Sequence, residues 1–291
     1  MRIPFIIPFI KAHGAGNDFL YTFEAELTQE ITEERLVDAS RAICHRNTGV
    51  GADGWYLVGA PGQGCHARLR LYNSDGSKAE LSGNGTRCAA AILVDRGDAD
   101  KEVRILTGAG ARTLRLVERQ GRRYEFEMDM GPIRYRSEDL RFQLKLRDGA
   151  RTVTILDVGN PQCAVVVESL QFDWRKAGAE IEGHPYFPKR TNVSFFRKVD
   201  ERSIEARFYE RGAGPTLSSG TGSTGAAAAA MLLGMVGHEV RVHGETGYLD
   251  VRWPSSNAGK LPMEGGATLD GPIYLTGPAE IVAKGEYNWQ Q

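Results

Sequence analysis

Two serines at matching positions are the residues of this chain best suited by type and spacing to do chemistry. Ser82 and Ser219 each precede a Gly-x-Gly sequence, and a run of alanines begins seven positions after each serine. A polar residue, Asn73 in one copy and Glu210 in the other, stands nine positions before the serine. A glycine-rich turn that opens a helix leaves backbone N–H groups directed into the turn, where they bind anions. The sequence therefore predicts two similar anion-binding turns.

The matching stretches indicate an internal duplication. They run from Arg70 to Ala91 and from Arg207 to Ala228, and their offsets are identical. Chance rarely keeps so many offsets aligned in Gly-rich sequence. We expect the function to depend on both copies and to lie between them.

Length and composition fit two domains and a small-molecule partner. The 291 residues allow two halves of about 130 to 150 residues, each with its own core. We predict domains over 1–131 and 132–277, with the boundary at Gly131-Pro132, and we expect 278–291 to cross back and complete the first. A net charge of −1 favours neither nucleic acid nor an anionic membrane as partner. No later apolar run approaches the roughly 18 residues of a membrane helix.

The cysteines and the first ten residues indicate the cellular compartment of the protein. Cys44, Cys65, Cys88 and Cys163 form no C-x-x-C pair, which is typical of reduced thiols in a cytoplasmic protein. The apolar start, residues 1–10, is interrupted by two prolines and lacks a convincing cleavage site, so we interpret it as an edge strand and not as a signal peptide.

Hydrophobic periodicity predicts an α+β fold in which strands outnumber helices. Helices are expected at Thr32–Cys44, with Thr32 as N-cap, and near Trp174–Ile181. The segments Ala89–Val94 and Ala226–Met235 are apolar on every side, so each should be a central helix wrapped by sheet. Expected strands are Trp55–Val58, Ala67–Tyr72, Glu102–Leu106, Arg112–Glu118, Tyr124–Met128, Phe142–Leu146, Val153–Val158, Ala164–Val167, Thr191–Phe196, Ile204–Tyr209, Val240–Val242, Tyr248–Trp253 and Ala267–Leu269.

Two facing helix N-termini could hold one carboxylate and thereby acidify the neighbouring carbon. Removal of the α-proton of an amino acid builds charge on its carboxylate, and preorganised N–H donors stabilise that charge. Inversion at the α-carbon also needs an acid and a base on opposite faces. A duplicated fold supplies one proton-handling group from each half.

Six motifs closely resemble those of the diaminopimelate epimerases, PLP-independent enzymes of lysine and peptidoglycan biosynthesis. The resemblance implies two pseudo-symmetric domains, each of mainly antiparallel strands around a central helix, with the substrate between them, in a homodimer without a cofactor. It implies epimerisation of diaminopimelate from LL to meso. The motifs, in order from Lys11 to Ala230, are His13–Phe19, Asn73–Ser77, Ser82–Cys88, Gly159–Pro161, Arg190–Val193, and Tyr209–Gly214 with Gly220–Gly222.

The resemblance also assigns residues. Ser82 and Ser219 take the two catalytic positions. Gly83, Asn84, Gly220 and Thr221 would bind the carboxylate at the reacting carbon. The rest of the substrate would be held by Asn17, Asn73, Asn160, Asn192, Glu210 and Arg211, with Arg211 able to grip the distal carboxylate in a bidentate manner.

This chain departs from the family pattern at the catalytic positions. Serine occupies both places where the family has cysteine, and Gln162 stands where many members have histidine. A serine hydroxyl is much less acidic than a thiol and needs a base to assist it. Asp75, Glu80 and Glu210 are the nearest helpers in the sequence.

Other functions remain open at this point. A related amino-acid racemase or dehydratase would use the same site, and a non-catalytic amino-acid binder would have kept the pocket and lost the chemistry. Taken singly, each serine also fits a plain N-cap. Gly220–Gly225 matches the dinucleotide fingerprint, with Glu239 about 20 residues on, but no β-α-β alternation is evident around it. The scattered histidines lack metal-ligand spacing.

Overall fold

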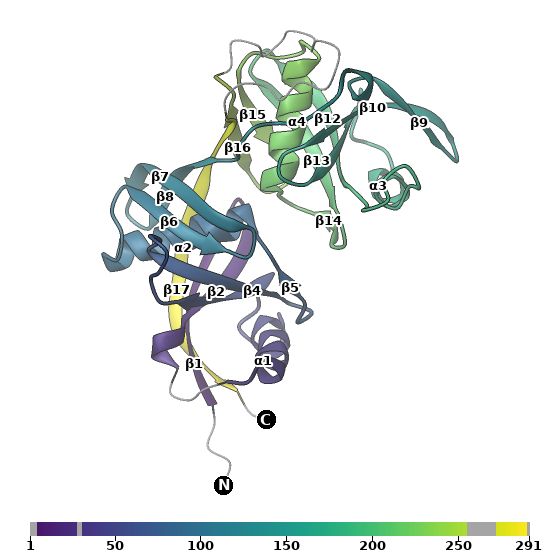
Figure 1. Ribbon diagram of the computed structural model, residues 1–291. Coiled ribbons are helices and arrows are strands. Elements are labelled where there is room, and N and C mark those ends of the chain that lie inside the picture. Colours follow the sequence, from purple (N-terminus) through teal and green to yellow (C-terminus); the bar gives the residue numbers. More distant parts are fainter. Residues whose placement is uncertain (1–4, 28–30, 255–271, 290–291) are drawn as a thin grey trace. The chain divides into compact units, whose positions relative to one another are not determined.

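The computed structural model describes residues 5–27, 31–254 and 272–289. The chain divides into two compact units, Met1–Met128 with Gly277–Gln291, and Asp129–Thr276 (Figure 1). The sequence placed the first boundary at Gly131-Pro132, three residues further along. The second boundary lies inside the last strand, whose end belongs to the first unit.

The first unit contains two helices and most of the early strands. The helices are α1 (Glu33–Cys44) and α2 (Gly83–Arg96), with a 3-10 turn, η1, at Glu24–Glu26. The strands are β1 (Phe5–Gly14), β2 (Asn17–Phe23), β3 (Gly54–Gly59), β4 (Ala67–Asn73), β5 (Lys78–Ala79), β6 (Glu102–Thr107), β7 (Gly110–Gln120), β8 (Arg123–Asp129) and the greater part of β17 (Tyr274–Trp289).

The strands of the first unit close into a barrel-like sheet. β1 pairs antiparallel with β2, β2 runs parallel to β3, and β3 pairs antiparallel with β4. β4 runs parallel to β6, and β6, β7 and β8 follow as antiparallel neighbours. β17 then pairs with both β8 and β1, which closes the ring. A closed sheet leaves its interior to be filled by other residues.

The second unit repeats this pairing scheme. Its helices are α3 (Trp174–Glu182) and α4 (Gly220–Leu232), with a 3-10 turn, η2, at Ser137–Asp139. Its strands are β9 (Phe142–Leu146), β10 (Gly149–Asp157), β11 (Pro161–Val166), β12 (Asn192–Asp200), β13 (Ser203–Glu210), β14 (Gly214–Thr216), β15 (Glu239–His243) and β16 (Tyr248–Arg252). From β10 to β16 the neighbours are antiparallel, parallel, antiparallel, parallel and antiparallel, as from β1 to β7. The duplication expected from the sequence is therefore confirmed.

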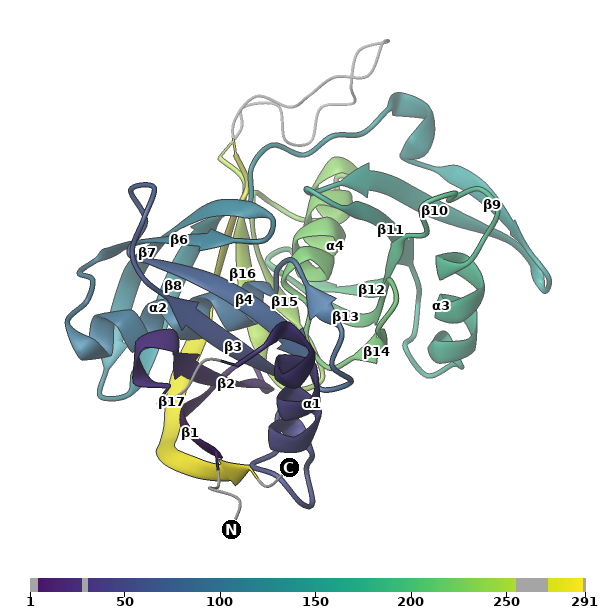
Figure 2. The same ribbon diagram turned by 60° about the horizontal axis from the view of Figure 1, so that its bottom comes forward.

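Each unit is built around one helix of small residues. In α2 every residue from Asn84 to Leu93 is buried, and in α4 every residue except Thr221 is buried. α2 packs against β1, β2 and β6, whereas α4 packs against β10–β13, β15 and β16 (Figure 2). Alanine side chains let strands approach a helix on every side. The predicted α+β class with central helices is confirmed.

The two outer helices are amphipathic. α1 buries Leu36, Ala39 and Ile43 against the strands of the first unit. α3 packs its apolar face on β12 and β13 in the second unit. Thr32 is the N-cap of α1, as predicted, although its side chain makes no capping hydrogen bond.

The edge-strand interpretation of residues 1–10 is confirmed for Phe5–Phe9 and is wrong at Ile10. Ile10–His13 pairs with β17 on one side and with β2 on the other. Phe5–Phe9, which contains Pro8, pairs with β17 on one side. Proline lacks an N–H group and is tolerated where one side of a strand needs no donor. Pro8 therefore indicates only that its own part of the strand pairs on one side. The pairing of the residues after it depends on β2 and β17, which the local sequence does not show.

β2, β5 and β14 were not predicted as strands. β2 begins within the His13–Phe19 motif, and β5 and β14 contain too few residues to show a periodicity. The expected strand at Ala267–Leu269 lies outside the described residues. None of the described helices combines the length and the hydropathy that a membrane span requires.

Candidate functional site

Ser82 begins the central helix of the first unit. Its backbone is extended, and its Oγ accepts a hydrogen bond of 3.2 Å from the Gly85 N–H group, while its carbonyl oxygen accepts the Thr86 N–H at 2.8 Å. This is the geometry of an N-cap. The N–H groups of Gly83 and Asn84 precede the first intrahelical hydrogen bond, and the helix dipole adds positive potential there.

Ser219 occupies the same position in the second unit. Its Oγ accepts the Gly222 N–H at 3.1 Å, and its carbonyl oxygen accepts the Ser223 N–H at 2.9 Å. Ser219 is 2% exposed, whereas Ser82 is half-buried. The two serines are therefore equivalent as caps but differ in their access to water.

Asn17 opens β2 at the tip of the β1–β2 hairpin. Ala15 and Gly16 carry the positive φ angles of this turn, so Asn17 itself is not in the left-handed region. Its amide group donates to the Asp53 carboxylate, and its Oδ1 lies 3.4 Å from Asn84 Nδ2. The hairpin thus brings one predicted substrate-binding residue to another at the start of α2.

A buried arginine supports the same helix start. Arg87 is fully buried, its guanidinium donates to Asn84 Oδ1, and its Nε lies 3.4 Å from the Pro278 carbonyl oxygen. Burial lowers the pKa of Arg87 to about 10, while nearby Cys88 and Tyr21 oppose that shift. A buried cation beside the helix N-terminus strengthens the positive potential at this site.

Asn73 and Asp75 belong to the turn between β4 and β5. Asn73 Nδ2 donates to Ser77 Oγ at 2.9 Å. Asp75 accepts the Ser77 N–H and hydroxyl groups, and these hydrogen bonds lower the pKa of Asp75. Asp75, expected as a possible helper of Ser82, is thus committed to its own turn.

Tyr56 is the residue beside Ser82 that the sequence reasoning missed. It lies on β3, is 2% exposed, and stacks on Tyr21 with ring centroids 5.1 Å apart. A tyrosine inside an apolar strand is normally read as core. Its position in the strand carried no signal that its hydroxyl group would reach the start of α2.

In the second unit, Asn160 and Gln162 form one amide pair. Gln162 Nε2 donates to Asn160 Oδ1 at 2.7 Å, and Asn160 Nδ2 lies 3.4 Å from Thr221 Oγ1. Gln162 is 1% exposed. The structure thus links the Gly159-Asn160 turn to the second residue of α4, as it links Asn17 to α2.

Asn192 and Arg211 are joined through the backbone. Asn192 Nδ2 donates to the Pro161 carbonyl at 2.9 Å, and its Oδ1 accepts the Arg211 N–H at 3.0 Å. Both ends of the Asn192 amide are therefore used to position chain segments. The exposed Arg211 guanidinium reaches the Lys189 carbonyl oxygen at 3.3 Å.

Glu210 is the acidic residue that the structure places beside a serine. Burial raises its pKa, and the hydrogen bond with the Ser219 hydroxyl group partly offsets that rise. A carboxylate with a raised pKa binds a proton more strongly and is a better base. Asp75 is held by Ser77, whereas the pKa of Glu210 responds to the Ser219 hydroxyl group.

The dinucleotide alternative does not fit the helix. β13 and β15 are parallel neighbours that flank α4, so the expectation of no β-α-β arrangement is wrong. Gly220–Gly225, however, lies inside α4, and β13 also pairs antiparallel with β12 and β14. A dinucleotide site needs the glycines in the loop before the helix, within a parallel sheet.

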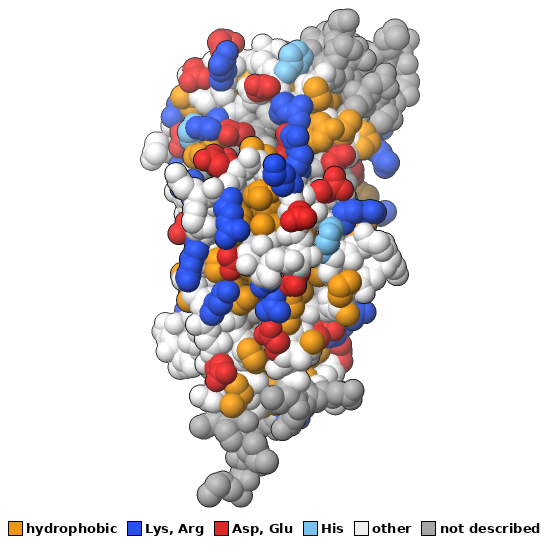
Figure 3. Space-filling view, turned by 90° about the vertical axis from the view of Figure 1, so that its left-hand side faces the viewer, with side chains coloured by type: hydrophobic (Ala, Val, Ile, Leu, Met, Phe, Trp, Pro, Cys, Tyr) orange, Lys and Arg blue, Asp and Glu red, His pale blue; other side chains and the backbone are white. Residues whose placement is uncertain are grey.

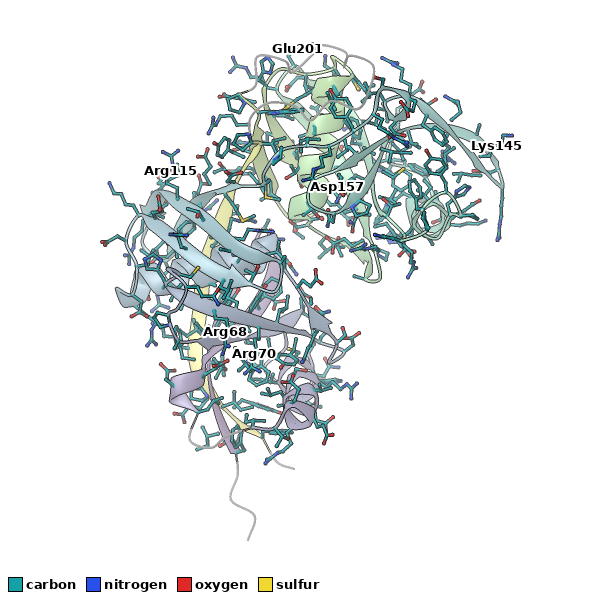
Figure 4. The ribbon with its side chains drawn as sticks, viewed as in Figure 1. Arg68, Arg70, Arg115, Lys145, Asp157 and Glu201 are labelled. Atoms are coloured by element: carbon teal, nitrogen blue, oxygen red, sulfur yellow. The ribbon has the colours of Figure 1, made fainter. Side chains whose placement is uncertain are left out.

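Other features of the surface are separate from these residues. A groove of about 1140 Å³ lies between the β9–β10 hairpin and α3, lined by Lys145, Arg151, Phe172 and Lys176 among others; Figure 4 shows Lys145 on this hairpin. None of the predicted site residues lines it.

Basic and acidic side chains are interspersed over the face in Figure 3. Within the described ranges, no three His, Cys, Asp or Glu side chains are grouped as metal ligands would be.

Comparison with known proteins gives a consistent result. The family model for diaminopimelate epimerase matches residues 9–136 and 154–269. The chain is 34% identical to a diaminopimelate epimerase of Pelotomaculum thermopropionicum, over 97% of this chain and 99% of that protein. It is 35% identical to one of Desulfitobacterium hafniense, over 95% and 96% of the two chains.

Solved structures show the same fold. A hydroxyproline epimerase of Agrobacterium vitis superposes with a TM-score of 0.70 at 16% identity, over 100% of this chain and 95% of that one. A phenazine biosynthesis protein of the PhzF family from Bacillus anthracis superposes with a TM-score of 0.68 at 17% identity, over 98% and 99% of the two chains. Sequence and fold agree, and the chain belongs to the diaminopimelate epimerase family.

Proposed function

We propose that this protein epimerises diaminopimelate from LL to meso, without PLP, in lysine and peptidoglycan biosynthesis. Membership of the family and the names of its relatives support this activity. The structural observation that carries the proposal is the repeated helix start. In each unit a serine caps the central helix, and the helix then begins with a glycine and a polar residue, which is Asn84 in α2 and Thr221 in α4.

The first two residues of each central helix are assigned to the substrate carboxylate. These are Gly83 and Asn84 in α2 and Gly220 and Thr221 in α4. The third N–H group of each helix is bonded to the serine Oγ, and the first two N–H groups precede it at the helix start. Donors held in this way stabilise charge as it develops on the carboxylate.

The remaining predicted residues are assigned to the rest of the substrate. Asn17 and Asn160 lie beside the two helix starts, where an amide can bind the α-amino group or the carboxylate. Asn73 and Arg211 are assigned to the distal end, and Asn192 positions Arg211 through its backbone. A guanidinium suits a second carboxylate because its two N–H groups match the two oxygens.

The proton transfers are assigned to one serine in each unit. Inversion needs a base on one face of the α-carbon and an acid on the other. In the second unit Ser219 can accept the α-proton while its own proton passes to Glu210, whose raised pKa favours the transfer. Ser82 is then the donor on the other face.

The protein is also proposed to be a cytoplasmic homodimer that does not bind nucleic acid. The four cysteines are free and buried, which fits a reducing compartment. The net charge of −1 provides no basic field for nucleic acid. The homodimer rests on the resemblance to the family and is tested by sedimentation.

The activity is tested by proton exchange. LL- and meso-diaminopimelate are incubated with the protein in D₂O, and Cα deuteration, stereochemistry and elimination products are followed by NMR. We expect inversion with deuterium incorporation. The same assay is run on Ser82→Cys, Ser219→Cys and the double variant, and we expect the double variant to be at least about 10²-fold faster, because a thiol is the stronger acid.

Lysine, which lacks the second carboxylate, is the control substrate. If Arg211 binds the distal carboxylate, the α-proton of lysine should exchange slowly in every variant. Exchange or elimination without inversion would instead support a dehydratase or lyase. Binding without exchange, in the wild-type protein and in the double variant, would identify an amino-acid binder and overturn the proposal.

A further inference from the structure

The hydroxyl group of Tyr56 is buried at the start of α2. The Tyr56 side chain is 2% exposed, and among the described residues no group meets hydrogen-bond geometry with its Oη. Tyr21, stacked on it with an interplanar angle of 2°, does have a partner and donates to the Gly85 carbonyl at 2.7 Å. Buried hydroxyl groups are nearly always bonded, so this exception requires an explanation.

Tyr56 Oη is directed at the start of α2. A Cβ atom on residue 85 would overlap the Tyr56 hydroxyl group, so Gly85 is the residue that admits it. The N–H of the same Gly85 is bonded to Ser82 Oγ at 3.2 Å. The phenol oxygen and the serine oxygen therefore adjoin one glycine.

The effect of the surroundings on Tyr56 agrees with this placement. Burial raises the pKa of Tyr56 and nearby Cys88 raises it further, whereas the Ser82 N–H and hydroxyl groups and the Thr86 hydroxyl lower it. Tyr56 is therefore protonated at neutral pH. It stands as a proton donor close to the Ser82 and Thr86 hydroxyl groups.

We propose that Tyr56 is a positioning residue for Ser82, which donates a hydrogen bond to the serine oxygen and supplies it with a proton during turnover. This role rests on the proposed function. It answers the chemical problem of the departure from cysteine, because a phenolate spreads its negative charge over the ring, whereas an alkoxide holds it on one oxygen atom.

The step balances with the groups present. The electron pair on the α-carbon forms a C–H bond with the Ser82 hydroxyl proton as the Ser82 O–H bond breaks. The Tyr56 O–H bond breaks at the same time, its proton moves to Ser82 Oγ, and the negative charge ends on the phenolate oxygen. After product release, solvent water returns the proton through Ser82.

The two serines then have partners of different chemical type. Ser219 has a carboxylate, Glu210, which accepts a proton, and Ser82 has a phenol, Tyr56, which gives one. The second unit thus contains the group suited to remove the α-proton, and the first unit contains the group suited to return it. The asymmetry distinguishes this pair from two matched thiols.

The test is Tyr56→Phe, which deletes one oxygen atom. The variant should lose about 10²-fold in kcat for inversion and for deuterium uptake at the face that Ser82 serves, with KM little changed. Its Tm should change little, because the Tyr56 hydroxyl group has no hydrogen-bond partner among the described residues of the resting protein and donates to Ser82 during turnover. A loss of rate without a loss of stability is the signature expected.

Two comparisons separate this role from a structural one. Tyr21→Phe removes the hydroxyl group of the stacked ring and with it the hydrogen bond to the Gly85 carbonyl. Its Tm should therefore fall, while its kcat is largely retained. In a Ser82→Cys background, Tyr56→Phe should change kcat by less than about threefold, since a thiol does not need the phenol and the two effects are coupled.

Each outcome decides the matter. An equal loss from Tyr56→Phe in the serine and cysteine backgrounds, or no loss in the serine protein, overturns the role of Tyr56. Failure of the proposed function looks different: neither the wild-type protein nor the Ser82→Cys/Ser219→Cys variant would then exchange the α-proton of diaminopimelate.

Discussion

Glu210 and Ser219 illustrate, at the scale of single residues, how a group suited to catalysis is kept at the expense of stability. The carboxylate is poorly solvated, and the Ser219 hydroxyl group compensates only part of that loss. The same desolvation raises the affinity of Glu210 for a proton. Stability and basicity therefore change in opposite directions at this position.

Glu210→Gln is predicted to lower kcat/KM for inversion by at least about 10²-fold, because an amide cannot accept the proton of Ser219. In the wild-type protein kcat/KM should fall as the pH drops through the folded pKa of Glu210, and this limb should lie above pH 4.5 because burial raises that pKa. Steady-state rates measured across pH check both expectations.

The stability of the same variant has a predictable sign. A raised folded pKa means that the contribution of Glu210 to stability is complete below pH 4.5 and is lost as the pH rises through the folded pKa. Glu210→Gln should therefore have a higher Tm than the wild-type protein at neutral pH, and the difference should shrink below pH 4.5.

Glu205→Gln is the matched control, since Glu205 lies on the same strand but forms ion pairs with Arg197 and Arg207. It should keep the wild-type rate and gain no stability at neutral pH. Equal effects of the two substitutions would contradict the assignment of Glu210.

At the scale of elements, the serines have a second role as helix caps. Each Oγ holds the third N–H of a helix of small residues, in which few side chains are large enough to fix the helix by themselves. The cap aligns the first N–H groups that are assigned to the carboxylate. The cap and the proposed proton transfer therefore use the same oxygen atom in each unit.

Substitution by alanine and glycine separates the two roles. Ser82→Ala and Ser219→Ala should each lower the free energy of unfolding by about 1 kcal/mol, whereas the corresponding glycine variants should lose only a few tenths of that unit. All four should lose inversion activity. Denaturant unfolding and the exchange assay measure the two effects, and retained activity in a glycine variant would show that the serine oxygen is dispensable.

At the scale of the whole molecule, β17 connects the last part of the chain to the first. Its beginning, Tyr274–Thr276, pairs with β16, and its remainder pairs with β1 and β8. The first unit therefore contains a strand that follows the second unit in the sequence, and its barrel-like sheet cannot close until β17 has been synthesised.

A chain ending at Thr276 tests this dependence. Without Gly277–Gln291, β1 and β8 lose a neighbour, so amide protons of α2 should exchange rapidly while those of α4 stay protected. Hydrogen exchange with mass spectrometry reads both helices in one experiment. A chain ending at Trp289 is the control and should protect both; retained protection of α2 in the shorter chain would show that the first unit is stable without β17.

The sequence by itself determined the class of fold, the duplication and the position of each serine before a central helix. These features follow from local patterns: the period of apolar residues, the small residues of α2 and α4, and the fixed offsets around Ser82 and Ser219. The same patterns, with the resemblance to the family, selected the residues that are assigned to the substrate.

Tertiary structure alone decided which groups meet. Tyr56 and Ser82 are far apart in the chain and come together because β3 passes the start of α2, and β1 is covered by β17 from the other end of the protein. Asp75 is closer to Ser82 in sequence than Glu210 is to Ser219, yet the hydrogen bonds of Asp75 are made within its own turn. The number of residues between two side chains does not show whether they are in contact, because hydrogen bonding and burial depend on where strands cross a helix.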